Sequence, residues 1–398
     1  MIKCILGNIA DVTMGQSPKS EYYNFEGHGM PFLQGNRTFG EKYPTFDTYT
    51  TMSTKTAKAG DVIMSVRAPV GDLNITPVDI CLGRGVCGIR MKNGNQDFLF
   101  YLLRYYMPHL INKESGTVFG SINRNDINKL EIEIPEEPSK QIYISRILAS
   151  LDEKIDINNK INENLSEQIR TLCNAWLNDY IPFGGECPED WKLTPLSSFA
   201  NFIGGYSYKS DELQNSSVAM ATIKNFNRKG GFKLDGYKEI VASGKLKSEH
   251  HVDLFDTLVA HTDLTQNAEV IGNAEPVLSF SNYSDIIFSM DIVKVVPTIP
   301  YISKYLLAAL LQTQKFKEHC LGYVNGTTVL HLSKKALQDY SLMLPQNFAI
   351  IKPLDDIVTS IYQQMAFNID ECSRLEKIRD NLLPQLMSGE LDVSSIDI

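Results

Sequence analysis

Two long segments of the chain carry apolar residues at alternating intervals of three and four positions. The first runs over residues 148–176 and the second over 358–386, at an offset of 210 positions. Such spacing forms the contact line, or seam, between two paired helices of a coiled coil. At 1.5 Å per residue, about 40 residues make a helix of about 60 Å. The seam is predicted to contain Leu151, Ile155, Asn158, Leu165, Ile169, Leu172, Ile361, Met365, Asn368, Leu375 and Leu382.

Two asparagines and one proline interrupt the apolar pattern of these segments. Asn158 and Asn368 occupy the same place in the two segments. A seam asparagine can fix the register of two helices at some cost in stability, and the alternative is a position on the solvated edge; the pattern leaves both open. Pro384 is expected to end or kink the second helix, because proline clashes with the preceding turn. Leu386 would then lie outside the seam.

Weaker matches repeat around the helical segments. Residues 116–135 and 326–345 both begin with glycine and end with proline, again at an offset of 210. We therefore predict a first domain over residues 1–137, a central helix over 138–185, a second domain over 186–346 and a C-terminal helix and tail over 347–398. The helices are expected to pair as an antiparallel rod with a domain at each end, giving a pseudo-two-fold internal repeat.

Each domain mixes short β-rich runs with helical segments. Strands are expected at residues 61–66 and 256–260, and helices at 98–112 and 301–320. The predicted fold class is therefore α+β.

Composition and charge narrow the possible functions. The net charge is −9, of which residues 136–185 and 346–398 carry −8, so both domains are nearly neutral. The chain as a whole is thus not a polybasic nucleic-acid or membrane binder. Seven scattered cysteines without C-x-x-C spacing indicate a reducing compartment rather than a disulfide framework or a zinc site. Neither a signal peptide nor an apolar stretch of about 20 residues is found, so we expect a cytoplasmic protein that does not enter a membrane.

No pattern typical of an active site occurs. The chain has no phosphate-binding loop of the G-x-x-x-x-G-K-[ST] type and no dinucleotide fingerprint. His250, His251 and His261 could hold a metal, but their spacing fits no known zinc-hydrolase pattern. The segment 83–85, Gly-Arg-Gly, could cradle a phosphate or form a tight turn with a surface arginine. Residues 224–229 combine asparagine, arginine and lysine, which suit base edges and phosphates, although a solvated loop would look the same.

Several stretches together resemble the specificity (S) subunits of type I restriction–modification systems, and the resemblance covers essentially the whole chain. They include Gly15-Gln16-Ser17-Pro18, Met30-Pro31-Phe32-Leu33-Gln34-Gly35-Asn36, the run from Gly60 to Gly71, Gly83-Arg84-Gly85, Ile223-Lys224-Asn225-Phe226, the run from Ala260 to Gln266, and the run from Leu382 to Leu391.

The resemblance implies a non-catalytic subunit that binds double-stranded DNA through two target-recognition domains, each reading one half of an interrupted target. It also implies that the helices dock two modification (M) methyltransferase subunits, to which restriction (R) subunits are added. S-adenosylmethionine is expected on the methyltransferase partner, with no cofactor and no metal in this chain. Because the two domains differ in sequence, the two half-sites should differ as well.

Polar and basic residues in expected loops are the candidate DNA contacts. They are Gln34, Asn36, Arg37, Arg67, Thr117 and Asn123 in the first domain, and Lys224, Asn225, Asn227, Arg228, His261, Thr328 and Lys334 in the second. Two other classes of function compete with this hypothesis: a two-headed protein-binding adaptor without DNA recognition, and an enzyme that uses the three histidines. A methylation-only system without a nuclease is a further variant.

Overall fold

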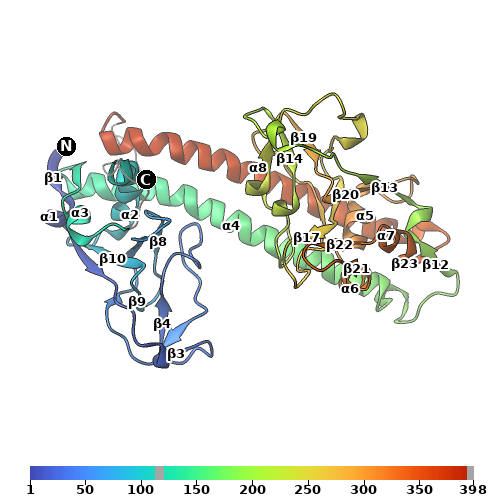
Figure 1. Ribbon diagram of the computed structural model, residues 1–398, viewed down its shortest axis with the longest axis horizontal. Coiled ribbons are helices and arrows are strands. Elements are labelled where there is room, and N and C mark those ends of the chain that lie inside the picture. Colours follow the sequence, from blue (N-terminus) through green and yellow to red (C-terminus); the bar gives the residue numbers. More distant parts are fainter. Residues whose placement is uncertain (113–120, 392–398) are drawn as a thin grey trace. The chain divides into compact units, whose positions relative to one another are not determined.

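A computed structural model describes residues 1–112 and 121–391. The chain divides into two compact units. The first unit comprises the described parts of Met1–Lys154 and Leu375–Ile398, and the second comprises Ile155–Arg374. Each unit therefore contains a globular part together with one portion of each of the two long helices (Figure 1).

The first unit contains three sheets. A four-stranded antiparallel sheet has the order β2-β10-β7-β8, a five-stranded sheet has the order β3-β5-β4-β9-β6, and β1 pairs with β11. The strands are β1 Ile2–Ile5, β2 Ala10–Met14, β3 Tyr23–Asn24, β4 Met30–Leu33, β5 Tyr49–Thr50, β6 Thr56–Ala57, β7 Val62–Ser65, β8 Leu73–Ile75, β9 Ile80–Leu82, β10 Val86–Met91 and β11 Glu131–Ile134. The helices before the long pair are α1 Leu6–Ile9, α2 Gln96–Asn112 and α3 Arg124–Asn128.

The second unit repeats the main parts of this plan. Its four-stranded sheet has the order β13-β20-β16-β18, its three-stranded sheets are β15-β14-β19 and β17-β22-β21, and β12 pairs with β23. The strands are β12 Trp191–Pro195, β13 Ala200–Gly204, β14 Val218–Ala221, β15 Lys238–Glu239, β16 Thr257–Ala260, β17 Thr262–Asp263, β18 Ala274–Pro276, β19 Asp285–Phe288, β20 Ile292–Pro297, β21 Val324–Asn325, β22 Leu330–Leu332 and β23 Ser341–Pro345. The short helices are α5 Lys304–Leu311, α6 Gln314–Leu321 and α7 Lys335–Asp339.

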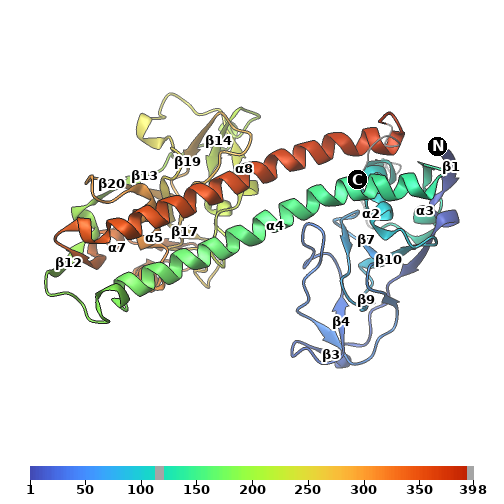
Figure 2. The same ribbon diagram turned by 180° about the vertical axis from the view of Figure 1, so that it is seen from behind.

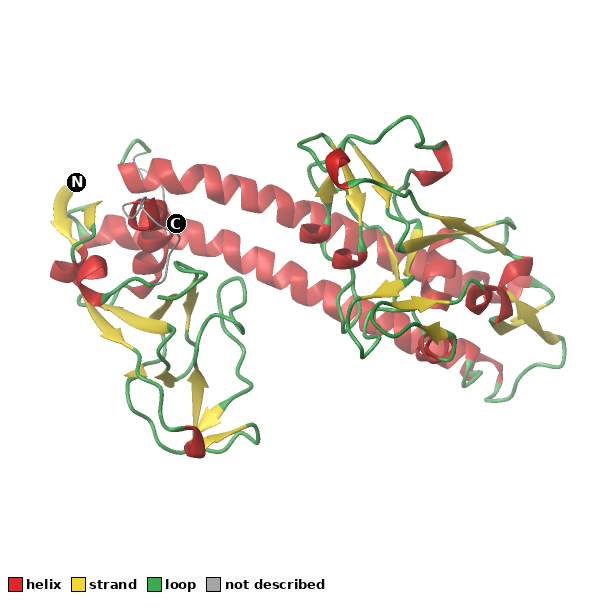
Figure 3. Ribbon diagram, in the orientation of Figure 1, coloured by secondary structure: helices red, strands yellow, loops and turns green. Residues whose placement is uncertain are grey.

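Corresponding strands and helices confirm the α+β class and the internal repeat. In each four-stranded sheet the central pair is antiparallel, β10 with β7 in one unit and β20 with β16 in the other. Helix α2 packs on β7, β8 and β10, and α5 packs on β16, β18 and β20. Figure 3 shows the strands of each unit gathered beside the long helices.

The two long helices are α4, Pro138–Leu177, and α8, Lys352–Ser388. The first begins at the predicted position and ends eight residues before the predicted boundary at residue 185. Within each unit the two helices run side by side (Figure 2). Their three-four periodicity explains this pairing, because it places one stripe of each helix against the other.

The seam asparagines are buried rather than solvated. Asn158 and Asn368 are 1% and 3% exposed. The Asn158 amide donates to the Glu371 carboxylate at 2.7 Å, and the Asn368 amide donates to the Asn162 side-chain oxygen at 2.8 Å. Asn162 in turn donates to the backbone oxygen of Met365 at 3.2 Å. The solvated-edge alternative is therefore wrong, and these asparagines bond across the helix pair.

Two helix predictions are corrected. The segment predicted as one helix, 301–320, forms two, because Ser303 caps α5 and Thr313 caps α6 after a break at Gln312. Pro384 does not end α8, which continues to Ser388.

The reason for the second correction is burial. Leu383, Leu386 and Met387 pack into the core of the first unit with α2 and the four-stranded sheet. Burying a large apolar side chain contributes about 1.5–3 kcal/mol, which together offsets the roughly 3 kcal/mol cost of an internal proline. Leu386 is thus a core residue at 1% exposure.

The core of the second unit is built from the same kinds of elements. Its α5 is buried over Leu306–Leu311 and packs with Ile169 of α4 and Val358 of α8. Among the described residues, no helix is both long and apolar enough to cross a membrane.

Candidate nucleic-acid interface

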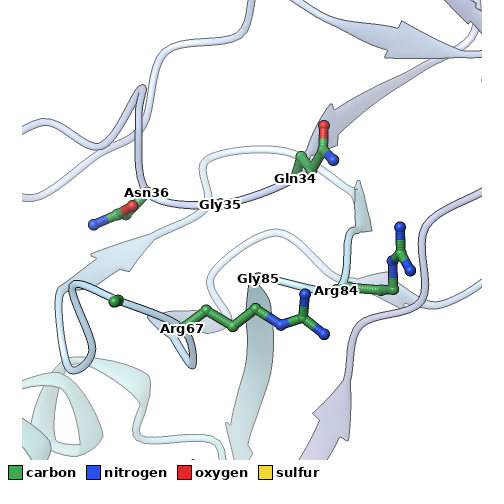
Figure 4. A pocket seen from close by; sticks show the side chains of 7 residues that line it. Gln34, Gly35, Asn36, Arg67, Arg84 and Gly85 are labelled. Atoms are coloured by element: carbon green, nitrogen blue, oxygen red, sulfur yellow. The ribbon is translucent and has the colours of Figure 1, made fainter. Parts of the chain in front are cut away.

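Three loops of the first unit form a polar hollow. It is lined by Gln34, Gly35, Asn36, Arg67, Ala68, Arg84 and Gly85. These residues follow β4, β7 and β9, so each loop starts where a strand of the first unit ends. Three predicted contacts, Gln34, Asn36 and Arg67, therefore come together around one site (Figure 4).

Backbone hydrogen bonds hold the three loops together. The Gly85 amide donates to the Gln34 oxygen at 3.0 Å, and the Val66 amide donates to the Gly85 oxygen at 2.9 Å. Glycine is needed at this approach, because a Cβ at Gly83 would lie 2.6 Å from Gln34 Cα, and one at Gly85 would lie 2.4 Å from the Gln34 oxygen. The Gly-Arg-Gly sequence thus presents Arg84 at the rim of the hollow.

Two arginines dominate the chemistry of the hollow. Arg67 and Arg84 are exposed, and their side chains extend in the same direction, whereas Asn36 points the other way (Figure 4). Within residues 1–112 and 121–391, neither guanidinium forms an ion pair with a carboxylate. Asn36 is engaged, since its amide donates to Asp72 at 2.6 Å. Among the described residues, the hollow therefore offers two guanidinium groups that need not leave a carboxylate to bind an anion or a base.

Of the remaining predicted contacts of the first domain, two lie outside the hollow and already bond to other residues of the domain. Arg37 is exposed but pairs with Asp47 at 2.7 Å, and bonds from Arg37 and Thr48 lower the pKa of the Asp47 carboxyl. Asn123 caps α3, accepting hydrogen bonds from the amides of Asn125 and Asp126. Thr117 lies outside the described residues.

In the second unit, the predicted 224–229 segment forms a turn between β14 and β15. Lys224, Asn227 and Arg228 are exposed. Asn225 is fully buried: its amide donates to the Lys233 oxygen at 2.7 Å, and its side-chain oxygen accepts from the Thr222 amide at 2.8 Å. Asn225 is therefore a structural residue of the turn, which corrects its assignment as a DNA contact. Buried amides of this kind satisfy backbone groups that turns leave unpaired.

Hydrogen bonds to the side chains of Glu275 and Asn273 attach this turn to the rest of the second unit. The Gly231 amide donates to Glu275 at 2.6 Å, and the Asn273 amide donates to the Asn227 oxygen at 2.9 Å. Glu275 also accepts from Gln312 at 2.6 Å, and Gln312 accepts from the Tyr362 hydroxyl of α8. Burial raises the pKa of Glu275 to about 7. A chain of hydrogen bonds thus joins the turn to the long helix.

The other predicted contacts of the second domain lie on different segments. His261 is half-buried between β16 and β17, and burial together with the positive potential of His331 and Lys334 lowers its pKa. Its Nε2 atom is buried without a hydrogen-bond partner among the described residues. Thr328 and Lys334 are exposed. The positive charge of Lys334 therefore acts on His261 and disfavours its protonated form.

The three histidines do not converge. His251 bonds Asp285 at 2.6 Å, while His250 is buried against Tyr206 and Phe288. Within the part of the chain that the structure describes, no group of three histidine, cysteine, aspartate or glutamate side chains could hold a metal ion.

All of the predicted seam residues are buried or half-buried. Ile155, Asn158, Ile169, Met365 and Asn368 are buried, whereas the others are half-buried, namely Leu151, Leu165, Leu172, Ile361, Leu375 and Leu382.

Sequence reasoning left out three polar residues that matter in the structure. The Gly83-Arg84-Gly85 segment was predicted to cradle a phosphate or to form a tight turn, but Arg84 was not among the candidate DNA contacts, although its two flanking glycines were a usable signal. Arg379 lies in the seam and bonds Asp152 at 2.7 Å, and Asp152 also accepts from the Tyr101 hydroxyl at 2.5 Å. Glu275 carries no local signal, because its partners come from distant segments.

Comparisons with known proteins agree with this geometry. Residues 3–167 match the model of the type I restriction modification DNA specificity domain. A putative type I restriction enzyme MjaX specificity subunit from Methanocaldococcus jannaschii is 39% identical over 168 residues, covering 42% of this chain and 39% of that relative. The match thus spans well under half of that relative. The type I restriction enzyme MjaIX specificity subunit of the same organism is 21% identical over 415 residues, covering 98% of this chain and 93% of the relative.

A solved structure extends the likeness to the whole fold. The crystal structure of the type I restriction–modification system S subunit from M. genitalium has a TM-score of 0.57 and 18% identity, and the match covers 99% of this chain and 96% of that one. At this identity the likeness concerns the fold. Residues 3–167 thus match the type I DNA specificity domain, and over its whole length the chain is similar in fold to a type I S subunit.

Proposed function

We propose that this chain is the specificity subunit of a type I restriction–modification system, and that each of its domains reads one half of an interrupted double-stranded DNA target. The observation that carries the proposal is the hollow of the first unit, where Arg67 and Arg84 stand free of carboxylates within the described residues. Guanidinium groups suit both phosphates and base edges. In the second unit, the exposed turn with Lys224, Asn227 and Arg228 supplies similar chemistry. Two domains of different sequence would read two different half-sites.

The long helices are proposed to dock two modification subunits. Both helices expose large apolar side chains outside the seam, including Ile157 and Ile161 of α4, at 50% and 41% exposure, and Phe367 of α8 at 55%. An internal repeat offers two equivalent surfaces and therefore favours two copies of one partner. Restriction subunits would join this core.

The chemistry is proposed to reside on the partners. The modification subunits would bind S-adenosylmethionine and methylate adenine, and this chain would supply the target sequence without catalysing a reaction. We propose that it acts in the cytoplasm, which its seven cysteines, none of them in a disulfide, support.

An adenine-methylation map of the host genome, with and without the gene, tests the proposal. Deletion should abolish methylation at one asymmetric, interrupted motif. Capture of the full chain should also recover a methyltransferase in about two copies per chain. Recovery of partners without any change in methylation or any affinity for DNA would favour the protein-binding adaptor instead.

A further inference from the structure

The two units present matching positions around the hollow, and hydrogen bonding identifies them residue by residue. In the first unit Ser65 pairs with Val86, and the Val66 amide donates to the oxygen of Gly85 at 2.9 Å. In the second unit Ala260 pairs with Ile292, and the His261 amide donates to the oxygen of Asp291 at 2.9 Å. The residues after these strands therefore correspond.

A second register gives the same correspondence independently. Leu33 pairs with Leu82 in parallel strands of the first unit, and Ala221 pairs with Phe288 in parallel strands of the second. Counting forward from Leu82 and Phe288 matches Arg84 with Met290. Arg67 bridges to Ser121 as Thr262 pairs with His331, which matches Arg67 with Thr262.

The chemistry at the two matched positions differs between the units. In the first unit both positions are exposed arginines at the rim of a hollow whose glycines bring the backbone loops close together. In the second unit one position is a threonine with 4% exposure, and the other is an exposed methionine. Neither of these side chains carries a charge, so the second unit has no guanidinium at these two places.

We propose that Arg67 and Arg84 make the first unit read a guanine in its half-site, and that the second unit reads its half-site without a guanine contact from the matched positions. Arginine reads guanine by donating two parallel hydrogen bonds to O6 and N7. A guanidinium already paired to a carboxylate would have to give up that partner, as Arg37 would with Asp47 and Arg228 with Glu269. Among the described residues, Arg67 and Arg84 form no such pair.

The inference rests on the proposed function, and its experiment starts from the methylation map. The map gives both half-sites, and maps from Arg67→Ala and Arg84→Ala strains assign one half to the first unit, since only that half should relax. The complex recovered from its host with the full chain is then titrated with duplexes that carry each half-site, or the same half-site with one G·C pair replaced by A·T.

The replacement should weaken binding of the wild-type complex by about 10- to 100-fold at one G·C pair. In Arg67→Ala or Arg84→Ala the two duplexes should bind within about threefold of each other. Arg67→Lys and Arg84→Lys keep the charge but not the rigid, planar fork of the guanidinium, so they should weaken the preference. Met290→Ala, at the matched position, should leave it intact, as should Arg146→Ala on the exposed face of α4.

Two results would overturn the inference. Equal weakening of all duplexes by the alanine variants, with full retention by the lysine variants, would make both arginines phosphate contacts. A first half-site without any G·C dependence would exclude guanine reading. Both results leave an interrupted motif on the map and hence the proposed function, whereas an unchanged map together with no DNA affinity would refute both.

Discussion

The buried ion pair between Arg379 of α8 and Asp152 of α4 is expected to be the most sensitive polar contact of the first unit. Arg379 donates to Asp152 at 2.7 Å, and the two side chains are 12% and 9% exposed. Asp152 also accepts from the Tyr101 hydroxyl of α2, so one carboxylate joins three helices. Burial and the negative charge of Asp152 raise the pKa of Tyr101, which therefore remains a donor at any physiological pH.

Substituting Arg379→Ala should lower the unfolding free energy of the first unit by about 3–5 kcal/mol, because it leaves a buried carboxylate without its counter-charge. Asp380, which also pairs with Arg379 at 2.9 Å, pairs with Arg104 at 3.3 Å, and this more exposed pair provides a comparison. Its side chains are 33% and 56% exposed, so Arg104→Ala should cost less than about 1 kcal/mol. In a protein that already carries Asp152→Asn, which removes the buried charge, Arg379→Ala should lower the unfolding free energy less than it does in the wild type, by a difference of at least about 2 kcal/mol.

The assay must separate the two units. Both tryptophans, Trp176 and Trp191, lie in the second unit, so their fluorescence follows that unit during urea unfolding. Hydrogen exchange of peptides covering 96–112 follows the first. Arg379→Ala should accelerate exchange in α2 and leave the tryptophan transition unmoved. An equal cost of Arg379→Ala in both backgrounds, or a cost no larger than that of Arg104→Ala, would refute the reasoning.

Three further outcomes are expected. Burial raises the pKa of Glu275 to about 7, so the stability that its protonated form contributes is present at low pH and is lost as the pH rises through 7. The unfolding free energy of the second unit should therefore fall by about 3 kcal/mol between pH 4 and 9, and Glu275→Gln should flatten this fall. Parallel pH profiles of the wild type and the variant in urea unfolding would contradict this cause. Asn368→Ala should destabilise the second unit by about 1–3 kcal/mol, because it leaves the amide oxygen of the half-buried Asn162 on α4 without this donor. A loss below about 0.5 kcal/mol in tryptophan-detected unfolding would be too small for that bond. Gly85→Ala places a Cβ 2.4 Å from the Gln34 oxygen and should lower the melting temperature, whereas Gly35→Ala, with nothing within 4 Å, should not; equal melting temperatures would show that the loops adjust.

Part of the fold could be read from the sequence because its signals are local. The three-four spacing of residues such as Ile155 and Ile169 needs only neighbours on one helix to be recognised. The strands at 62–65 and 257–260 likewise follow from β-branched residues between turn signals. The resemblance to the S subunits rested on contiguous motifs in the same way. Helix pairing, the α+β class and the similarity to type I specificity subunits could all be predicted at this level.

The site depended on contacts between segments far apart in the chain. Asn225 looks like a base-reading side chain in sequence, yet the Lys233 oxygen and the Thr222 amide occupy its amide group. Arg37 likewise pairs with Asp47, whereas Arg67 pairs with no carboxylate among the described residues, and the neighbouring sequence shows neither state.

The sequence by itself therefore determined which elements form, how the two domains repeat, and which family the chain resembles. The tertiary structure alone decided which polar side chains are free to bind, that α8 continues through Pro384, and that Arg84 stands beside Arg67. The physical reason is that helix and strand formation follows the periodicity of neighbouring residues, whereas the burial and pairing of a polar group depend on partners that only folding brings within hydrogen-bond distance.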